Sequence, residues 1–235
     1  MPTLNGAVLL VTGANGGLGT RFVHQALERG AVKVYAAARK PKDWGDDRIV
    51  PLVLDVTSPD SIAAAAGIAN DVTVLINNAG VSNGSSVLGD LSAARDLFET
   101  NFWGALAVAN AFIPALKATR GTLLNVLSAL SWLGVGEGAY SASKAALWQA
   151  TNTQRIKLAP DDVHVASLHL GYADTPLAKG VDAPKLDPAD VVRSAYDGLE
   201  AGAYEILADE LSGQVKAALA GPIEALYPQL ARSDA

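Results

Sequence analysis

Short apolar runs alternate with longer helix-like stretches along this chain, and this alternation constrains its fold most strongly. The apolar runs are rich in Val, Leu and Ile, as expected of strands that are covered on both faces. We expect strands at 7–11, 33–37, 49–54, 72–76, 122–127, 163–169 and 205–208. We expect helices at 17–29, 58–69, 91–118, 139–158 and 188–201. Strand–helix repeats of this kind predict a parallel sheet with right-handed crossovers, here one doubly wound α/β domain over residues 1–235.

Composition excludes several classes of protein. Of 235 residues, 50% are hydrophobic and 18% are charged, which supports a sizeable core and argues against a disordered chain. The absence of cysteine excludes disulfides, thiolate chemistry and cysteine zinc sites. The formal net charge of −6 argues against a nucleic-acid partner. The three histidines lack metal-ligand spacing, so no metal site is expected and we expect His24, His164 and His169 to be structural or surface residues.

The sequence also predicts a cytoplasmic protein without a membrane partner. Its first residues, 1–6, lack the basic region and apolar stretch of a targeting signal. The most apolar window, 104–116, is shorter than the roughly 20 residues that span a bilayer.

A glycine-rich turn follows the first expected strand and opens the first expected helix, with the sequence Thr-Gly-Ala-Asn-Gly-Gly-Leu-Gly from Thr12. Gly13 suits the tight turn, Gly17 a close approach of backbone to phosphate, and Gly19 the packing of helix against strand. A glycine-rich turn without a ligand is the alternative. The strand before it and the helix after it favour a dinucleotide, whose pyrophosphate would meet the free N–H groups of the helix.

The T-G-x-x-x-G-x-G spacing of this turn resembles the short-chain dehydrogenase/reductase family, whose fold is Rossmann-like. The resemblance implies that the turn holds the nucleotide through Gly13, Asn15, Gly17, Leu18 and Gly19.

The second expected strand ends at Ala38-Arg39-Lys40. NAD-binding sites usually place a carboxylate at the position that Ala38 occupies here, and a carboxylate there would repel a 2′-phosphate. Arg39 and Lys40 can instead pair with such a phosphate. The family associates an arginine just after this position with NADP, so we predict NADP(H), with solvated surface charges as the alternative.

Two further motifs follow successive strands. Asp55-Val56 matches the place where the family contacts adenine, and Asn77-Asn78-Ala79-Gly80 matches its N-N-A-G motif. The resemblance implies nucleotide contacts at Asp55, Val56, Asn77, Ala79 and Gly80. Ordinary turn chemistry is the alternative, because Asn and Gly favour turns.

Tyr140 and Lys144 form a Y-x-x-x-K pair within Tyr-Ser-Ala-Ser-Lys-Ala-Ala, which is similar to the family's catalytic motif. Positions i and i+4 share a helix face, so the ammonium is expected to lower the phenol pKa and allow general acid–base catalysis. The resemblance implies that both residues also contact the nucleotide. Ser128 follows the fifth expected strand and matches the family's polarising serine, with Ser131 as its rival.

Two matches are less regular. Asn101 resembles the Asn of the family's N-x-x-G segment. In the family, a local helix break frees the backbone carbonyl of this Asn, which binds a water that leads to the lysine. The alternative is an exposed helical Asn.

Gly171, Ala173 and Thr175 match the family's nicotinamide-binding turn, but Leu170 replaces the family's proline. Thr175 capping a turn is the alternative.

We therefore predict reversible hydride transfer between NADP(H) and a small carbonyl/alcohol pair. The alternatives are a non-enzymatic NADP-binding regulator or scaffold, and a reductase of acyl-carrier-bound substrates. The pocket walls are expected at 81–90, 130–138 and 172–188, with Trp132, Leu133, Tyr172 and Leu177 as apolar lining. The resemblance implies a homodimer or homotetramer built through the helices at 91–118 and 139–158.

Overall fold

A seven-stranded parallel sheet forms the centre of the computed structural model, which describes residues 3–231. Its strand order is β3-β2-β1-β4-β5-β6-β7. The strands are β1 (Val8–Thr12), β2 (Lys33–Ala38), β3 (Ile49–Val53), β4 (Val74–Asn77), β5 (Thr122–Val126), β6 (His164–His169) and β7 (Glu205–Leu207). The helices are α1 (Gly17–Glu28), α2 (Pro59–Ile68), α3 (Ser92–Phe98), α4 (Ala105–Thr119), α5 (Ala139–Leu158), α6 (Pro188–Glu200) and α7 (Glu210–Ala218). These elements form one Rossmann-like α/β domain, so the predicted fold class is confirmed.

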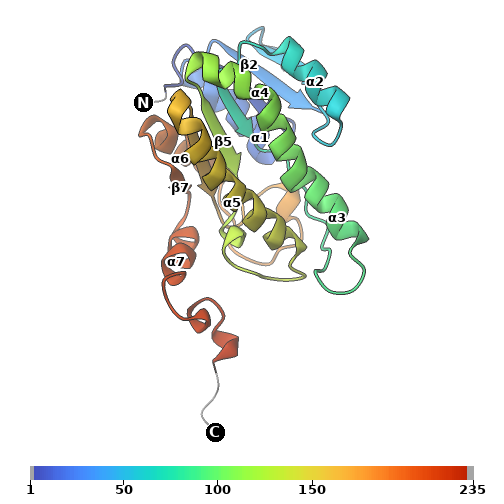
Figure 1. Ribbon diagram of the computed structural model, residues 1–235, viewed down its shortest axis with the longest axis vertical. Coiled ribbons are helices and arrows are strands. Elements are labelled where there is room, and N and C mark those ends of the chain that lie inside the picture. The colour runs from blue at the N-terminus through green and yellow to red at the C-terminus, as the bar shows by residue number, and fades with distance from the viewer. Residues whose placement is uncertain (1–2, 232–235) are drawn as a thin grey trace.

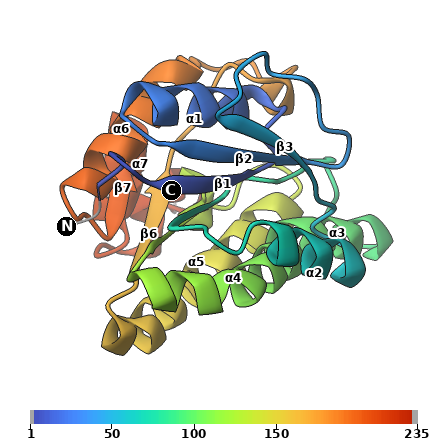
Figure 2. The same ribbon diagram turned by 90° about the horizontal axis from the view of Figure 1, so that it is seen from above.

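Helices cover both faces of the sheet, as Figure 2 shows: α1 and α6 lie on one face, and α2, α4 and α5 lie on the other. The chain runs outward from β1 through β2 to β3 and then returns to β4 beside β1. In sheets of this kind, ligands bind outside the carboxyl ends of the strands where the order reverses. The topology therefore places a binding crevice beyond Thr12 and Asn77, the last residues of β1 and β4.

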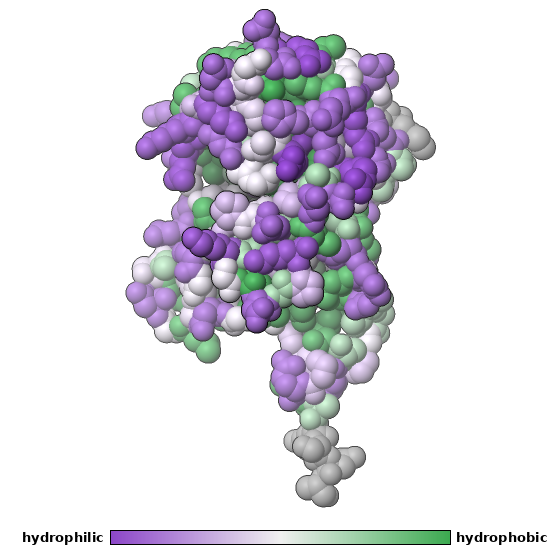
Figure 3. Space-filling view, turned by 180° about the vertical axis from the view of Figure 1, so that it is seen from behind, coloured by the Kyte–Doolittle hydropathy of each residue, from purple (hydrophilic) through white to green (hydrophobic). Residues whose placement is uncertain are grey.

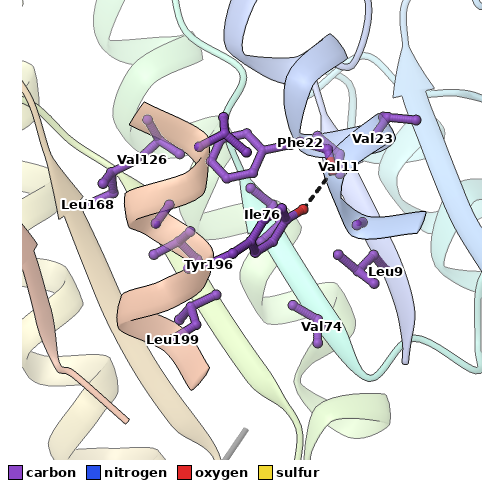
Figure 4. Close-up of a cluster of buried hydrophobic side chains, with 14 of the residues drawn as sticks. Leu9, Val11, Phe22, Val23, Val74, Ile76, Val126, Leu168, Tyr196 and Leu199 are labelled. Carbon is purple, nitrogen blue, oxygen red and sulfur yellow. Dashed lines mark hydrogen bonds between the residues drawn. The ribbon is translucent and has the colours of Figure 1, made fainter. Parts of the chain in front are cut away.

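The two helical layers bury separate apolar clusters against the sheet. In the layer of α1 and α6, Tyr196 is fully buried and its hydroxyl donates a hydrogen bond to the Phe22 carbonyl at 2.7 Å (Figure 4). The two rings meet edge to face at 5.4 Å. Because the hydroxyl has this partner, the large Tyr196 side chain adds buried apolar area without an unsatisfied polar group.

The predicted strands all form, with ends that differ by one or two residues. The helix expected at 91–118 is different: α3 passes through a π-helix over Glu99–Gly104 before α4 begins. The sequence analysis missed α7, which begins at the Asp209 cap. Pro51 lies in β3, where it is tolerated because β3 is an edge strand of the sheet.

The continuous helical run Ser92–Thr119 is long and apolar enough to span a membrane by length and composition, because one 18-residue window within it has a mean hydropathy of 1.2. A core helix passes the same test, and Val108, Phe112 and Leu116 of this run are buried against the sheet. The run therefore gives little support to a membrane span. Beyond α7 the chain extends away from the body (Figure 1), and hydrophobic side chains show among hydrophilic ones at that end of the molecule (Figure 3).

Candidate active site

A cleft of about 1130 Å³ opens at the carboxyl edge of the sheet. It is lined by residues that follow β1, β2, β3, β4, β5 and β6, and by α5. All but one of the predicted nucleotide-binding residues line it. They are Gly13, Asn15, Gly17, Leu18, Gly19, Arg39, Lys40, Asp55, Val56, Ala79, Gly80, Tyr140, Lys144, Ala173 and Thr175. The fold thus brings together motifs that lie up to 162 positions apart in the printed sequence, from Gly13 to Thr175.

The glycine turn leaves room that side chains would fill. Gly13 has φ +64°, a left-handed conformation, and a Cβ at Gly19 would lie 2.2 Å from the Gly13 carbonyl oxygen. A Cβ at Gly17 would lie 2.4 Å from Cγ2 of Thr175, so the turn predicted to bind nicotinamide packs directly on the glycine turn. Helix α1 starts at Gly17 without a side-chain cap, and its first residues, Gly17, Leu18 and Gly19, line the cleft. This cradle fits a pyrophosphate.

Thr12 holds the glycine turn against the turn after β4. Its hydroxyl accepts hydrogen bonds from the backbone N–H groups of Asn78 and Ala79, both at 2.9 Å. The Asn78 amide donates to the Thr12 carbonyl at 2.9 Å and to the Gly13 carbonyl at 3.3 Å. The sequence motifs that contain Thr12 and Asn78 gave no role to either residue, although the presence of both T-G and N-N-A-G was the available signal.

Asn77 is the predicted nucleotide contact that lies outside the cleft lining. It is buried, and its amide donates to the Ala105 carbonyl at 2.9 Å and to Asn125 Oδ1 at 3.1 Å. Asn77 is the last residue of β4, and its side chain is directed into the helical layer rather than toward the turn. Its neighbour Asn78 faces the glycine turn instead.

Two basic side chains lie at the end of β2. Arg39 and Lys40 line the cleft and are exposed, and Ala38 replaces the usual carboxylate. The Asn15 amide donates to the Lys40 carbonyl at 2.8 Å, which joins the glycine turn to this basic corner. A 2′-phosphate is the chemistry that such a corner fits.

Asp55 closes the same end of the cleft. Its carboxylate accepts hydrogen bonds from the Thr57 backbone N–H at 2.9 Å and from the Thr57 hydroxyl at 2.7 Å. These bonds, with a smaller contribution from Arg39, lower the pKa of Asp55. The carboxylate is therefore ionised and fixed in orientation.

Tyr140 and Lys144 lie one turn apart on α5, and both line the cleft. The Lys144 ammonium donates to the Val126 carbonyl at 2.8 Å and lies 5.8 Å from the centre of the Tyr140 ring. Burial, with a contribution from Tyr172, raises the pKa of Tyr140 to about 12. The expectation that the ammonium lowers this pKa is wrong for this structure, because desolvation of the phenolate is the dominant effect.

Lys144 itself is 4% exposed, and burial lowers its pKa to about 8 from the ordinary 10.5. Between these values the unfolded chain binds more protons than the folded one, so this residue makes the free energy of unfolding rise with pH. We expect wild type to gain about 1–2 kcal/mol from pH 8 to pH 9.5 relative to Lys144→Met. Urea unfolding of both proteins across this range measures the difference. Parallel curves would contradict the depressed pKa.

Ser128 lines the cleft, whereas Ser131 does not. The Ser128 hydroxyl donates to the Leu170 carbonyl at 3.2 Å and accepts from the Leu130 N–H at 3.1 Å. Ser131 Oγ accepts from the Ser128 backbone N–H at 3.3 Å and so supports the short turn that carries Ser128. Position in the cleft favours Ser128 over its rival.

Asn101 lies in the π-helix, so the local helix break implied at this residue is present. It is 1% exposed, which excludes the alternative of an exposed helical Asn. Its side chain forms two hydrogen bonds with the backbone of Val81: it accepts from the N–H at 2.8 Å and donates to the carbonyl at 2.9 Å. A Cβ at Gly80 would lie 3.4 Å from Asn101 Oδ1 and 3.7 Å from Lys144 Nζ. Asn101 therefore sits behind the cleft wall, next to the lysine.

The turn after β6 keeps its place without the proline. The Gly171 N–H donates to an Asp209 carboxylate oxygen at 2.5 Å, so α7 braces the turn through its own cap residue. Thr175 caps a short 3₁₀ turn by position but without a side-chain cap bond; its hydroxyl donates to the Ala173 carbonyl at 3.4 Å.

The far end of the cleft is walled by two loops that pair with each other. The Val87 N–H donates to the Glu137 carbonyl at 2.9 Å, and Ser86 and Gly138 form an antiparallel bridge. The C-terminal segment adds a further contact, because the Tyr227 hydroxyl accepts from the Gly134 N–H at 2.8 Å. These contacts hold the loop that leads into α5.

Trp132 is not part of the wall. It is 7% exposed and stacks on the buried His169 ring at 3.9 Å. Leu133, Tyr172 and Leu177 do line the cleft, together with Leu211 of α7, which the sequence analysis missed. The alternation of strands and helices predicts the sheet but carries no signal for this late helix.

Comparison with known proteins decides the family. A family model described as short chain dehydrogenase matches residues 7–185. The chain belongs to the short-chain dehydrogenase/reductase family. It is 37% identical over 183 residues to the short-chain dehydrogenase PC-15 of Penicillium crustosum, covering 71% of this chain and 66% of the relative. The chain spans about half to two thirds of the length of the first curated relatives it matches.

Solved structures of the family superpose over nearly the whole chain. A short-chain dehydrogenase from Burkholderia cenocepacia J2315, in complex with NADP, has a TM-score of 0.92 and 39% identity, covering 98% of this chain and 100% of that chain. A short-chain dehydrogenase/reductase from Burkholderia phymatum, in complex with NAD, has a TM-score of 0.84 and 21% identity, covering 100% and 99%. Of these two structures, the first holds NADP and the second holds NAD.

Proposed function

We propose that this short-chain dehydrogenase/reductase is an NADP(H)-dependent oxidoreductase that interconverts a ketone or aldehyde with an alcohol. The observation that carries the proposal is the convergence of Ser128, Tyr140 and Lys144 in one cleft with the glycine turn and the basic corner. When bound, the nicotinamide exchanges a hydride with the carbonyl carbon. In reduction Tyr140 donates its proton to the carbonyl oxygen, which Ser128 polarises.

The protonation states of the site suit carbonyl reduction. With its pKa raised to about 12, Tyr140 is a neutral phenol near neutral pH, which is the form that donates a proton. Lys144 keeps two N–H donors beyond its bond to Val126, and these fit the nicotinamide ribose. Asn101, in the π-helix next to Lys144, supports the water through which the proton is replaced.

The basic corner gives a test of the nucleotide preference. We expect Arg39→Ala to lower kcat/KM for NADPH by about 10- to 100-fold, because a charge-assisted contact to the 2′-phosphate is lost. The value for NADH should change less than about threefold, since NADH lacks that phosphate. Steady-state kinetics with both nucleotides measures the two ratios. Equal use of NADH and NADPH by wild type, unchanged in the variant, would contradict the assignment.

The competing function is a regulator or scaffold that binds NADP without turnover. A protein that only senses NADP does not require the combination of Ser128, Tyr140 and Lys144 in the cleft where the nicotinamide would lie. A screen of NADPH oxidation with ketones and aldehydes tests the proposal. Turnover of any of them supports the oxidoreductase, and saturable NADPH binding without turnover across the panel supports the regulator.

We also propose that the enzyme is a homo-oligomer, either a dimer or a tetramer. The helices expected to form its interface carry large apolar side chains that this chain leaves exposed, with Trp103 at 55% and Ile156 at 73%. A second copy would cover such surface.

A further inference from the structure

The charges that line the cleft are unevenly distributed. Arg39 and Lys40 lie at the nucleotide end, and Lys144 lies beside the proton donor. Among the residues that the structure describes, the far end of the cleft carries one charged lining side chain, Glu137, and it is acidic. An anionic substrate would thus meet no basic partner there and would face a carboxylate.

Large apolar side chains form much of the remaining surface of that end, beside the polar Ser82 and Ser85. They belong to Leu130, Leu133, Val135, Tyr172, Leu177 and Leu211. Val135, Leu177 and Leu211 are 39%, 48% and 43% exposed, and they line one end of the same cleft, so they offer apolar area that a bound ligand would bury. The area available for burial therefore favours an apolar substrate body.

The backbone at Glu137 is held in place by contacts with the facing loop. Its backbone carbonyl accepts from the Val87 N–H at 2.9 Å, and the next residue, Gly138, bridges to Ser86. The same loop is fixed at Gly134 by Tyr227. Tyr140, the proposed proton donor, follows Glu137 by three residues in the sequence, and both residues line the cleft.

We infer that the substrate is an uncharged or cationic, largely apolar carbonyl compound, and that Glu137 is a specificity-determining residue that disfavours anions. This inference rests on the proposed function. It selects neutral and cationic carbonyl compounds over keto acids and phosphorylated carbonyl compounds.

The test compares three ketones of one shape: 4-methylcyclohexanone, 4-oxocyclohexanecarboxylate and a 4-trimethylammonio-cyclohexanone. With wild type and NADPH at low salt, we expect kcat/KM for the neutral and cationic ketones to exceed that for the carboxylate by about tenfold or more. Glu137→Gln should raise kcat/KM for the carboxylate about three- to tenfold and lower it for the cation, with the neutral ketone within about twofold.

Glu28→Gln is the matched control. Glu28 is the last residue of α1 and does not line the cleft, and its substitution changes the net charge by the same amount as Glu137→Gln. It should leave the three ratios unchanged. A carboxylate that is the preferred substrate, ratios that do not respond to Glu137→Gln, or an enzyme that reduces other carbonyl compounds but none of these ketones would overturn the inference. Failure to reduce any carbonyl compound would overturn the proposed function itself.

Discussion

Tyr140→Phe is expected to lower kcat for carbonyl reduction by about 10³-fold. The change removes one oxygen and the transferable proton but keeps the ring, which packs where α5 meets the cleft. In the variant, a water molecule would be a poor substitute proton donor, because position 140 is half-buried and the pKa shift of Tyr140 is dominated by desolvation. Turnover of NADPH with the best carbonyl compound from the screen measures the loss.

The same variant should bind NADPH with nearly the wild-type Kd, since the glycine turn, Arg39 and Lys144 are untouched. Fluorescence titration of NADPH provides that control and separates loss of chemistry from loss of the cleft. Tyr204→Phe, on an exposed ring outside the cleft, should retain full activity. Near-wild-type kcat in Tyr140→Phe would show that another group transfers the proton.

The placement of the cleft could be predicted from sequence because most of the motifs follow strands of the same parallel sheet. The carboxyl ends of such strands meet at one edge, so motifs at Gly13, Arg39, Asp55, Ala79 and Ser128 converge once the order of elements is known. No side-chain detail was needed for that inference. A local helix break at Asn101 was expected only through the family resemblance, and the structure has a π-helix at this residue.

What the sequence could not provide depends on burial and on side-chain direction. The pKa of Tyr140 rises because the phenol is desolvated, and the i, i+4 spacing of Tyr140 and Lys144 carries no information about that. Asn77 and Asn78 are neighbours in one motif, yet only Asn78 faces the glycine turn. Trp132 turns inward because His169 offers a buried ring to stack on.

The loss of the family proline at Leu170 shows a similar dependence on tertiary contacts. Proline would fix the backbone of this turn by itself. Here the turn is fixed from outside: the Leu170 carbonyl accepts from the Ser128 hydroxyl and from the Ala129 N–H, and Asp209 of the missed α7 region binds Gly171. The element that the sequence analysis overlooked thus stabilises the segment whose path it left open.

Ser128→Ala is expected to lower kcat by about 10²- to 10³-fold, because it removes the hydroxyl that polarises the carbonyl oxygen in the proposed reaction. Its KM for NADPH should stay near that of wild type, since Ser128 follows β5 and lies apart from the glycine turn.

Ser131→Ala is the matched comparison. It removes a hydroxyl that accepts from the Ser128 N–H and does not line the cleft, so we expect a loss of about 1 kcal/mol in stability and less than about tenfold in kcat. Parallel measurement of kcat and of the free energy of unfolding separates the two roles. Equal losses of kcat, or a greater loss in Ser131→Ala, would contradict the assignment of Ser128. Such a result would indicate that Ser131 polarises the carbonyl oxygen and that its turn opens toward the cleft.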